Sequence, residues 1–235
     1  MLNFQIFSLF PQLFPGPLAY SITGEALNNK LWSLQTINMR DYATDKRGTV
    51  DDIVYGGGSG MLLKPDVVYN AITANIKQPS KLLYLSPRGK VLSQQMAVDF
   101  ATEQNIGILC GRYEGIDQRV LDELDIQEIS IGDYVLSGGE LACYVLIDCI
   151  LRCLPGVLGD ANSLEQESFS GAEYAYLLEY PQYTRPAVWQ QREVPAILLS
   201  GHHKNIEQWR KQQAEAITKQ NRPDLFAKYL EITKS

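Results

Sequence analysis

The sequence has few of the residues that build metal centres or disulfide frameworks. Its 235 residues include only two histidines and four cysteines. Cys110, Cys143, Cys149 and Cys153 stand in apolar runs, without C-x-x-C spacing or neighbouring histidines. We therefore expect reduced thiols in a core and neither a zinc site nor a disulfide frame. No group of carboxylates suggests a metal cage either.

Signals for secretion and membrane insertion are also missing. Met1 leads directly into LNFQIFSLF, with no basic region and no small-residue cleavage site. The most apolar stretch, 140–154, is too short and too charged to span a bilayer. These absences predict a cytoplasmic protein with no membrane partner.

The charge is distributed unevenly. The net charge is −6, which by itself argues mildly against a nucleic-acid partner. Residues 99–180 carry 16 acidic and 3 basic residues, whereas 201–235 carry 7 basic and 4 acidic ones, with His202 and His203 adjoining. An acidic total can therefore hide a basic, RNA-binding face near the C-terminus. A solvated helical tail is the alternative.

Apolar runs that alternate with helical patterns predict an α/β fold, with a mostly parallel sheet and helices on both faces. The domain boundaries that we expect are a ligand-binding domain over 1–155, a flexible linker over 156–175 and a small helical domain over 176–235. The long glycine-rich stretch 40–61 is expected to be a functional or mobile loop. The expected strands are 3–10, 34–39, 81–85, 106–110 and 126–131, and the expected helices are 17–30, 65–76, 93–105, 118–124, 140–154, 205–220 and 222–233.

The last of the expected helices in the first domain has an unusual composition. Of its 15 residues, 12 are apolar, and Glu140, Tyr144, Asp148 and Arg152 recur at every fourth position. This pattern predicts a helix that is buried nearly all round, with one polar seam. Ser137 and Glu140 have the S-x-x-E spacing of a capping box at its start.

Three strands end in loops suited to ligand binding. The segments are LYLSPRG, ILCGRYEG and ISIGDYVLSGG, at 83–89, 108–115 and 129–139. Ligands on parallel sheets bind at the carboxyl ends of the strands, and glycines let a ligand approach the backbone closely. These loops therefore predict one cleft. GGGSG at 56–60 lacks the spacing of dinucleotide and P-loop motifs, so those ligands are disfavoured.

The chain resembles, over essentially its full length, the bacterial tRNA (guanine-N1)-methyltransferases, the TrmD family of the SPOUT superfamily. These enzymes methylate the guanosine 3′ to the anticodon, at tRNA position 37. The motifs that carry the resemblance are SLFP at 8–11, TVDD at 49–52, YGGGSGM at 55–61, YLSPRG at 84–89, CGRYEGID at 110–117, IGDYVLSGGEL at 131–141, PGVLG at 155–159, YPQYTRP at 180–186 and LLSGHH at 198–203.

The resemblance implies a deep trefoil knot at the C-terminal edge of the sheet, which periodicity alone does not predict, because knots are rare. It implies a homodimer that binds S-adenosylmethionine and the anticodon stem-loop of tRNA, with help from Mg²⁺ at a site that no motif indicates. The cofactor-binding residues that it implies come from the three loops: Tyr84, Leu85, Ser86, Pro87, Gly111, Tyr113, Glu114, Ile131, Gly132, Asp133, Tyr134, Val135, Leu136, Gly138 and Gly139.

The resemblance also assigns residues to catalysis and to RNA binding. Guanine N1 carries a proton at neutral pH, so the reaction needs a base near N1 and positive charge near O6. Glu179 is expected to be the base and Arg152 the positive charge. An exposed loop carboxylate and a surface ion pair with Asp148 are the respective alternatives. The RNA contacts that we expect are Asp51, Arg112, Arg185, Lys204, Arg210, Lys211, Lys219 and Arg222, although Arg112 could bind the cofactor carboxylate instead.

Two rival functions remain open from the sequence. One is a ribose 2′-O-methyltransferase of the same superfamily, which needs no base for guanine N1. The other is a non-catalytic RNA-binding protein, which would leave the methyl group in place.

Overall fold

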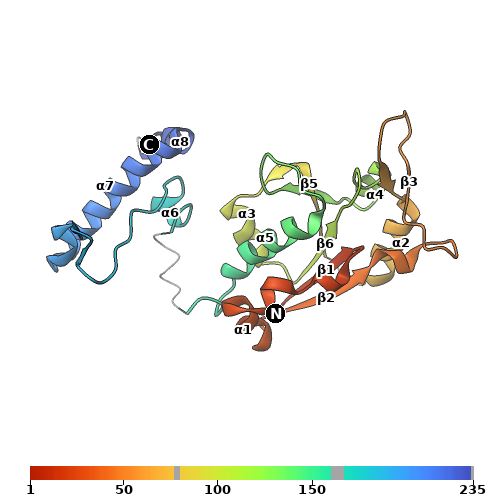
Figure 1. Ribbon diagram of the computed structural model, residues 1–235, viewed down its shortest axis with the longest axis horizontal. Helices are drawn as coiled ribbons and strands as arrows, with labels where there is room; N and C mark the ends of the chain where they lie inside the picture. Colours follow the sequence, from red (N-terminus) through yellow and green to blue (C-terminus); the bar gives the residue numbers. More distant parts are fainter. Residues whose placement is uncertain (77–79, 160–166, 234–235) are drawn as a thin grey trace. The chain divides into compact units, whose positions relative to one another are not determined.

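The computed structural model describes residues 1–76, 80–159 and 167–233. The chain divides into two compact units, Met1–Gly159 and Asp160–Ser235, and each is described by itself (Figure 1). Within the described residues, no helix is both long and apolar enough to cross a membrane.

A five-stranded parallel sheet forms the centre of the N-terminal unit, in the order β2-β1-β6-β5-β7. The predicted mostly parallel α/β fold is confirmed. All five predicted strands are present, with shifted ends. The strands are β1 (Leu2–Ser8), β2 (Trp32–Asn38), β5 (Lys81–Val91), β6 (Asn105–Cys110) and β7 (Gln127–Ser130).

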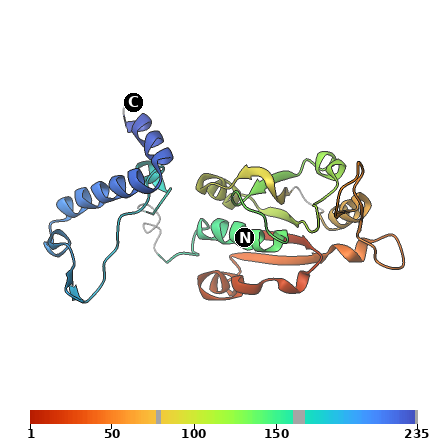
Figure 2. The same cartoon turned by 45° about the horizontal axis from the view of Figure 1, so that its top comes forward.

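Helices cover both faces of this sheet. Successive side chains of a strand point to opposite faces, so Phe4 and Ile6 lie in one core while Phe7 lies in the other. The first core is covered by α1 (Ser21–Asn28), α3 (Gln94–Ala101) and α5 (Gly139–Arg152), and the second by α2 (Pro65–Asn75) and α4 (Gln118–Glu123). Figures 1 and 2 show α3 and α5 side by side. Parallel strands buried on both faces explain the continuous apolar runs of the sequence.

The stretch 40–61 is more ordered than we predicted. It begins with the short helix Met39–Tyr42, and β3 (Asp51–Ile53) pairs antiparallel with β4 (Met61–Leu63). The tip 56–58 consists of three glycines with positive φ. Backbone hydrogen bonds from Glu114 N to Met61 O and from Leu63 N to Gly115 O, both 2.9 Å, attach this hairpin to the end of β6. The prediction of one long loop is therefore wrong at both strands.

Helix α5 begins differently from the prediction. Its N-cap is Gly138, and no side chain caps it, so the predicted capping box between Ser137 and Glu140 is wrong. Glu140 is buried instead, with 2% of its surface exposed. The helix is also less buried than we predicted, because Leu141 and Val145 are 58% and 44% exposed on one side of it.

The C-terminal unit is built mainly on two helices, α7 (His203–Asn221) and α8 (Pro223–Thr233). It also contains α6 (Gly171–Tyr174), the hairpin of β8 (Val188–Trp189) and β9 (Arg192–Glu193), and a short helix at Ala196–Leu199. Its small core includes Tyr174, Leu177, Tyr180, Ala214 and Tyr229.

The predicted linker 156–175 is wrong over its second half. Residues 167–175 fold onto the C-terminal unit: Phe169 N donates to Leu177 O at 3.2 Å, and the Tyr174 side chain is buried in the small core. Residues 156–159 belong to the N-terminal unit, and 160–166 lie outside the described residues. The polar composition of this stretch concealed one aromatic anchor, Tyr174.

The start of α5 should tolerate no side chain at position 139. A Cβ there would lie 2.8 Å from Cys110 Cα and 3.0 Å from Gly111 N. Alanine favours a helix interior over glycine by about 1 kcal/mol, but overpacking against backbone costs about 1–3 kcal/mol. We expect Gly139→Ala to lower the free energy of unfolding by about 1–2 kcal/mol, measured by urea denaturation. Gly159→Ala is the matched control, since nothing lies within 4 Å of its Cβ; equal stability of the two variants would contradict the contact.

Candidate functional site

The three predicted loops meet in one cavity of about 440 Å³, at the carboxyl ends of β6 and β7 and beside the middle of β5. This size suits a nucleoside-sized ligand. Asp133 does not line the cavity, and its side chain is exposed. The other fourteen predicted cofactor residues do line it: Tyr84, Leu85, Ser86, Pro87, Gly111, Tyr113, Glu114, Ile131, Gly132, Tyr134, Val135, Leu136, Gly138 and Gly139.

The first loop leaves the sheet as a bulge in β5. The pairing of β5 with β7 jumps between Leu85 and Lys90, both of which pair with Ile129. Gly89 packs so closely on β7 that a Cβ would lie 2.4 Å from the Glu128 carbonyl carbon. Residues 86–89 are therefore displaced from the strand. Ser86, Pro87 and Arg88 of this bulge line the cavity.

The Tyr84 ring restricts two positions of the second loop to glycine. Its hydroxyl lies 2.9 Å from the position of a Cβ at Gly111 and 2.8 Å from that at Gly115. Both glycines are therefore required by close approach to this ring. Burial raises the pKa of the Tyr84 hydroxyl, and the negative charge of Glu128 raises it further. Tyr84 therefore acts as a neutral wall.

The third loop forms the open side of the cavity. Gly132 has φ +145°, and its N–H donates to Ser130 Oγ at 3.2 Å. The Tyr134 hydroxyl donates to Ile131 O at 3.1 Å, which folds the loop on itself. Tyr134 and Val135 remain 54% and 84% exposed although they line the cavity. Within the N-terminal unit, the rim of the cavity therefore includes exposed side chains of the third loop.

Several cavity residues were not predicted, including Leu62, Ile116 and Gln118. Leu62 comes from the β3–β4 hairpin, and no local signal in the sequence links it to the loops. Ile116 lies within the motif CGRYEGID and Gln118 directly follows it, so the motif itself could have suggested them.

Neither a metal site nor a reactive cysteine is indicated among the described residues of the cavity. In the described part of the chain, no three His, Cys, Asp or Glu side chains come together as a metal site. Cys110 precedes Gly111, and burial raises the pKa of its thiol well above the usual value, with a contribution from its hydrogen bond to Cys143. A thiol of this kind stays protonated and packs as an apolar group.

The two predicted catalytic residues lie on different units. Arg152 is the last residue of α5 and is half-buried in the N-terminal unit, whereas Glu179 belongs to the C-terminal unit. Glu179 N donates to Ser168 Oγ at 2.9 Å, and Gln182 Nε2 donates to Glu179 Oε1. The segment that carries Glu179 therefore lies against Ser168. This pairing brings a second carboxylate residue, Glu167, into the same region of the unit.

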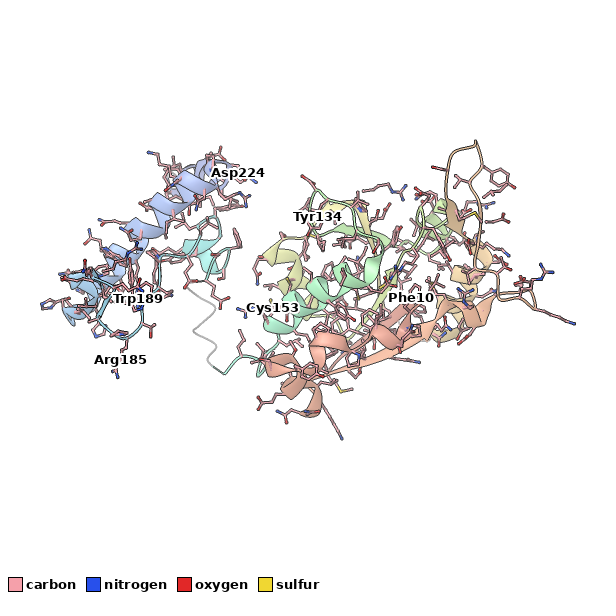
Figure 3. All side chains as sticks on the ribbon, in the orientation of Figure 1. Phe10, Tyr134, Cys153, Arg185, Trp189 and Asp224 are labelled. Carbon is pink, nitrogen blue, oxygen red and sulfur yellow. The ribbon has the colours of Figure 1, made fainter. Side chains whose placement is uncertain are left out.

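The predicted RNA-binding residues fall into two groups. Among the described residues, the side chains of Asp51 on β3, Arg185, Lys204 and Lys219 make no hydrogen bond or ion pair, and the three basic side chains are exposed. Arg185 and Trp189 lie at the end of the C-terminal unit remote from Asp224 (Figure 3). By contrast, Arg210 packs on the Tyr180 ring at 4.9 Å and Lys211 pairs with Glu173 at 2.7 Å. Arg222 pairs with Asp224 at 2.7 Å, and Arg112 also has internal partners, given below.

Comparison with known proteins gives the same family over the whole chain. The family model of tRNA (Guanine-1)-methyltransferase TrmD matches residues 2–228. The chain belongs to this family. It is 50% identical over 225 residues to the tRNA (guanine-N(1)-)-methyltransferase of Pelagibacter ubique, covering 96% of this chain and 97% of that protein. The proteins of the same name from Rhodospirillum rubrum and Ehrlichia ruminantium are each 52% identical, covering 96% and 95% of this chain and 92% and 94% of theirs.

Proposed function

We propose that this protein is a tRNA (guanine-N1)-methyltransferase that transfers a methyl group from S-adenosylmethionine to N1 of the guanosine at tRNA position 37. The single observation that carries the proposal is the match of the family over nearly the whole chain, together with relatives of that name at about 50% identity. The cavity formed by the three loops is the site that we propose for the donor. A tRNA substrate would place the reaction in the cytoplasm.

The cavity suits the chemistry of the donor. Main-chain N–H and C=O groups of the loops can read the edges of an adenine, because Gly111, Gly132 and Gly138 leave the backbone accessible. Leu85, Ile131 and Leu136 offer apolar walls for the rings. When bound, S-adenosylmethionine supplies an activated methyl group. The task of the protein is to hold it in line with the acceptor nitrogen.

The acceptor requires a base and a positive charge. Removal of the N1 proton makes the nitrogen a nucleophile, and density then builds on O6, where Arg152 would stabilise it. Glu179 is the base that the sequence suggests. Glu167 becomes the second candidate, because the pairing of Ser168 with Glu179 places both residues in one folded segment. No step of this proposal uses Mg²⁺.

The finer architecture also follows from the family. We propose that the chain is knotted, with α5 threaded through the sheet-edge loops. This is supported by the bond from Gly139 N to Gly111 O, which takes the chain from edge strand β7 to the end of β6, two strands away. We propose a homodimer, in which the partner covers the exposed apolar residues Tyr134, Val135, Leu141 and Val145. The C-terminal unit would bind the anticodon stem.

Methyl transfer to matched tRNA transcripts separates this function from its rivals. With tritiated S-adenosylmethionine, we expect a transcript with guanosine at position 37 to be methylated and one with adenosine there to remain unlabelled. The reason is that adenine N1 has no proton to remove and no O6. Equal labelling of both transcripts would favour ribose methylation, and labelling of neither would leave an RNA-binding protein.

Substitution of the two carboxylates should identify the base. The Glu→Gln change at the base should lower the single-turnover rate at saturating donor by about a hundredfold or more, whereas the change at the other position should stay within about tenfold. Donor affinity should hold within a few-fold for both, since the cavity belongs to the N-terminal unit. Glu193→Gln, which removes an exposed carboxylate of the same unit on β9, is the control. A full rate in both Glu179→Gln and Glu167→Gln would exclude this segment as the source of the base.

Binding of tRNA should depend on salt through the exposed basic residues of the C-terminal unit. Each phosphate contact contributes a slope of about −0.7 to −0.9 in the logarithmic plot of affinity against salt concentration. We expect Arg185→Gln and Lys204→Gln each to reduce the steepness of that plot by about one. Lys228→Gln, an exposed lysine of α8 outside the predicted set, should leave it unchanged. A flat salt dependence of the unsubstituted protein would remove this surface from the proposal.

A further inference from the structure

A buried carboxylate at the edge of the cavity has no part in the chemistry described so far. Glu140 Oε2 lies 2.9 Å from Arg112 Nη2, and the two side chains are only 3% and 23% exposed. Glu140 Oε1 accepts from Ser8 Oγ at 2.7 Å, and Ser8 Oγ accepts in turn from Phe10 N at 2.9 Å. The carboxylate therefore joins the end of β1 to the second cavity loop. Its Oε1 is fixed by a hydrogen bond, while its Oε2 lies in ion-pair contact with the guanidinium without a hydrogen bond of its own among the described residues.

Arg112 extends this connection to the third loop. Its Nη1 donates to Ser137 O at 3.2 Å, and its Cζ lies 4.5 Å from the centre of the Phe10 ring. A Cβ at Gly138 would lie 2.4 Å from Arg112 Nε, so the guanidinium fills the space that the absent side chain leaves. The planar group thus lies directly between the second and third loops, both of which line the cavity.

We propose that Arg112 and Glu140 are positioning residues, which set the separation of these two loops and thereby the affinity for the donor. This inference rests on the proposed function and assigns the Arg112–Glu140 pair a role in donor binding. Main-chain groups on loops have no intrinsic rigidity, and a displacement of about 1 Å is enough to impair a binding constellation. A guanidinium held by a buried carboxylate is a rigid spacer, since its fork has a fixed geometry.

This arrangement argues against an RNA phosphate as the partner of Arg112. Its Nη2 faces Glu140, its Nη1 donates to Ser137 O, and its Nε is buried beside Gly138, so few of its N–H groups remain accessible to a phosphate. The matching change at the carboxylate is Glu140→Gln, because glutamine keeps an oxygen for Ser8 and replaces the charged oxygen beside Arg112 with an NH₂ group that cannot pair with it.

The test measures the affinity for S-adenosylhomocysteine by calorimetry, the saturated single-turnover rate and the Tm of each variant. We expect Glu140→Gln and Arg112→Gln each to weaken affinity by about tenfold or more, with the rate at saturating donor within about threefold. The double variant should lose little beyond the worse single variant, because the two residues act as one unit. Arg119→Gln, which breaks an exposed pair with Asp117 outside the cavity lining, should match the unsubstituted protein.

Different outcomes separate this inference from the function itself. Unchanged affinity with a lower Tm would show that the pair only stabilises the fold, and fully additive losses would show that the residues act separately; either result overturns the inference. If Arg112→Gln kept normal donor affinity but bound tRNA more weakly, Arg112 would be an RNA contact and the inference would be wrong. Failure of the unsubstituted protein to bind the probe would count against the proposed function. Should Glu140→Gln not fold, Arg112→Lys tests the same point, since lysine keeps the charge but lacks the fork.

Discussion

The close contact between the start of α5 and the end of β6 is the constraint on which the N-terminal unit depends. The N–H of Gly139 donates to the carbonyl of Gly111 at 2.9 Å, with no side chain on either residue to separate the backbones. This contact places the second and third cavity loops side by side. It also carries Glu140 into the interior, where Ser8 and Arg112 meet it. The position of α5, the meeting of the second and third loops, and the Arg112–Glu140 pair therefore all depend on this backbone contact.

The sequence was informative where hydrophobic periodicity and loop composition act locally. Continuous apolar runs located all five strands of the sheet, and the glycine-bearing loops that follow three of them do meet in one cavity. The parallel arrangement itself requires the carboxyl ends to lie together, so the convergence could be predicted without knowledge of strand order. The order β2-β1-β6-β5-β7 could not, since it depends on which strands pair over long distances.

The errors have a common physical cause. Ser137 and Glu140 have the spacing of a capping box, but the half-buried Arg112 and the buried Ser8 contact that carboxylate instead. Asp51–Ile53 and Met61 fall in the predicted loop because a three-residue strand is too short to show a period. The linker prediction relied on polar composition and overlooked the packing of Tyr174. In each case a tertiary contact outweighed the local pattern.

The proposed catalytic residues are divided between the two compact units, which affects how methyl transfer is restricted to the correct substrate. The cavity and Arg152 belong to Met1–Gly159, whereas both candidate carboxylates belong to Asp160–Ser235. Under the proposed mechanism, the donor site and the base therefore come from different units. Methyl transfer would then require that both units assemble around the acceptor guanine, so selectivity for the right nucleic acid would depend on that assembly and not on donor recognition alone.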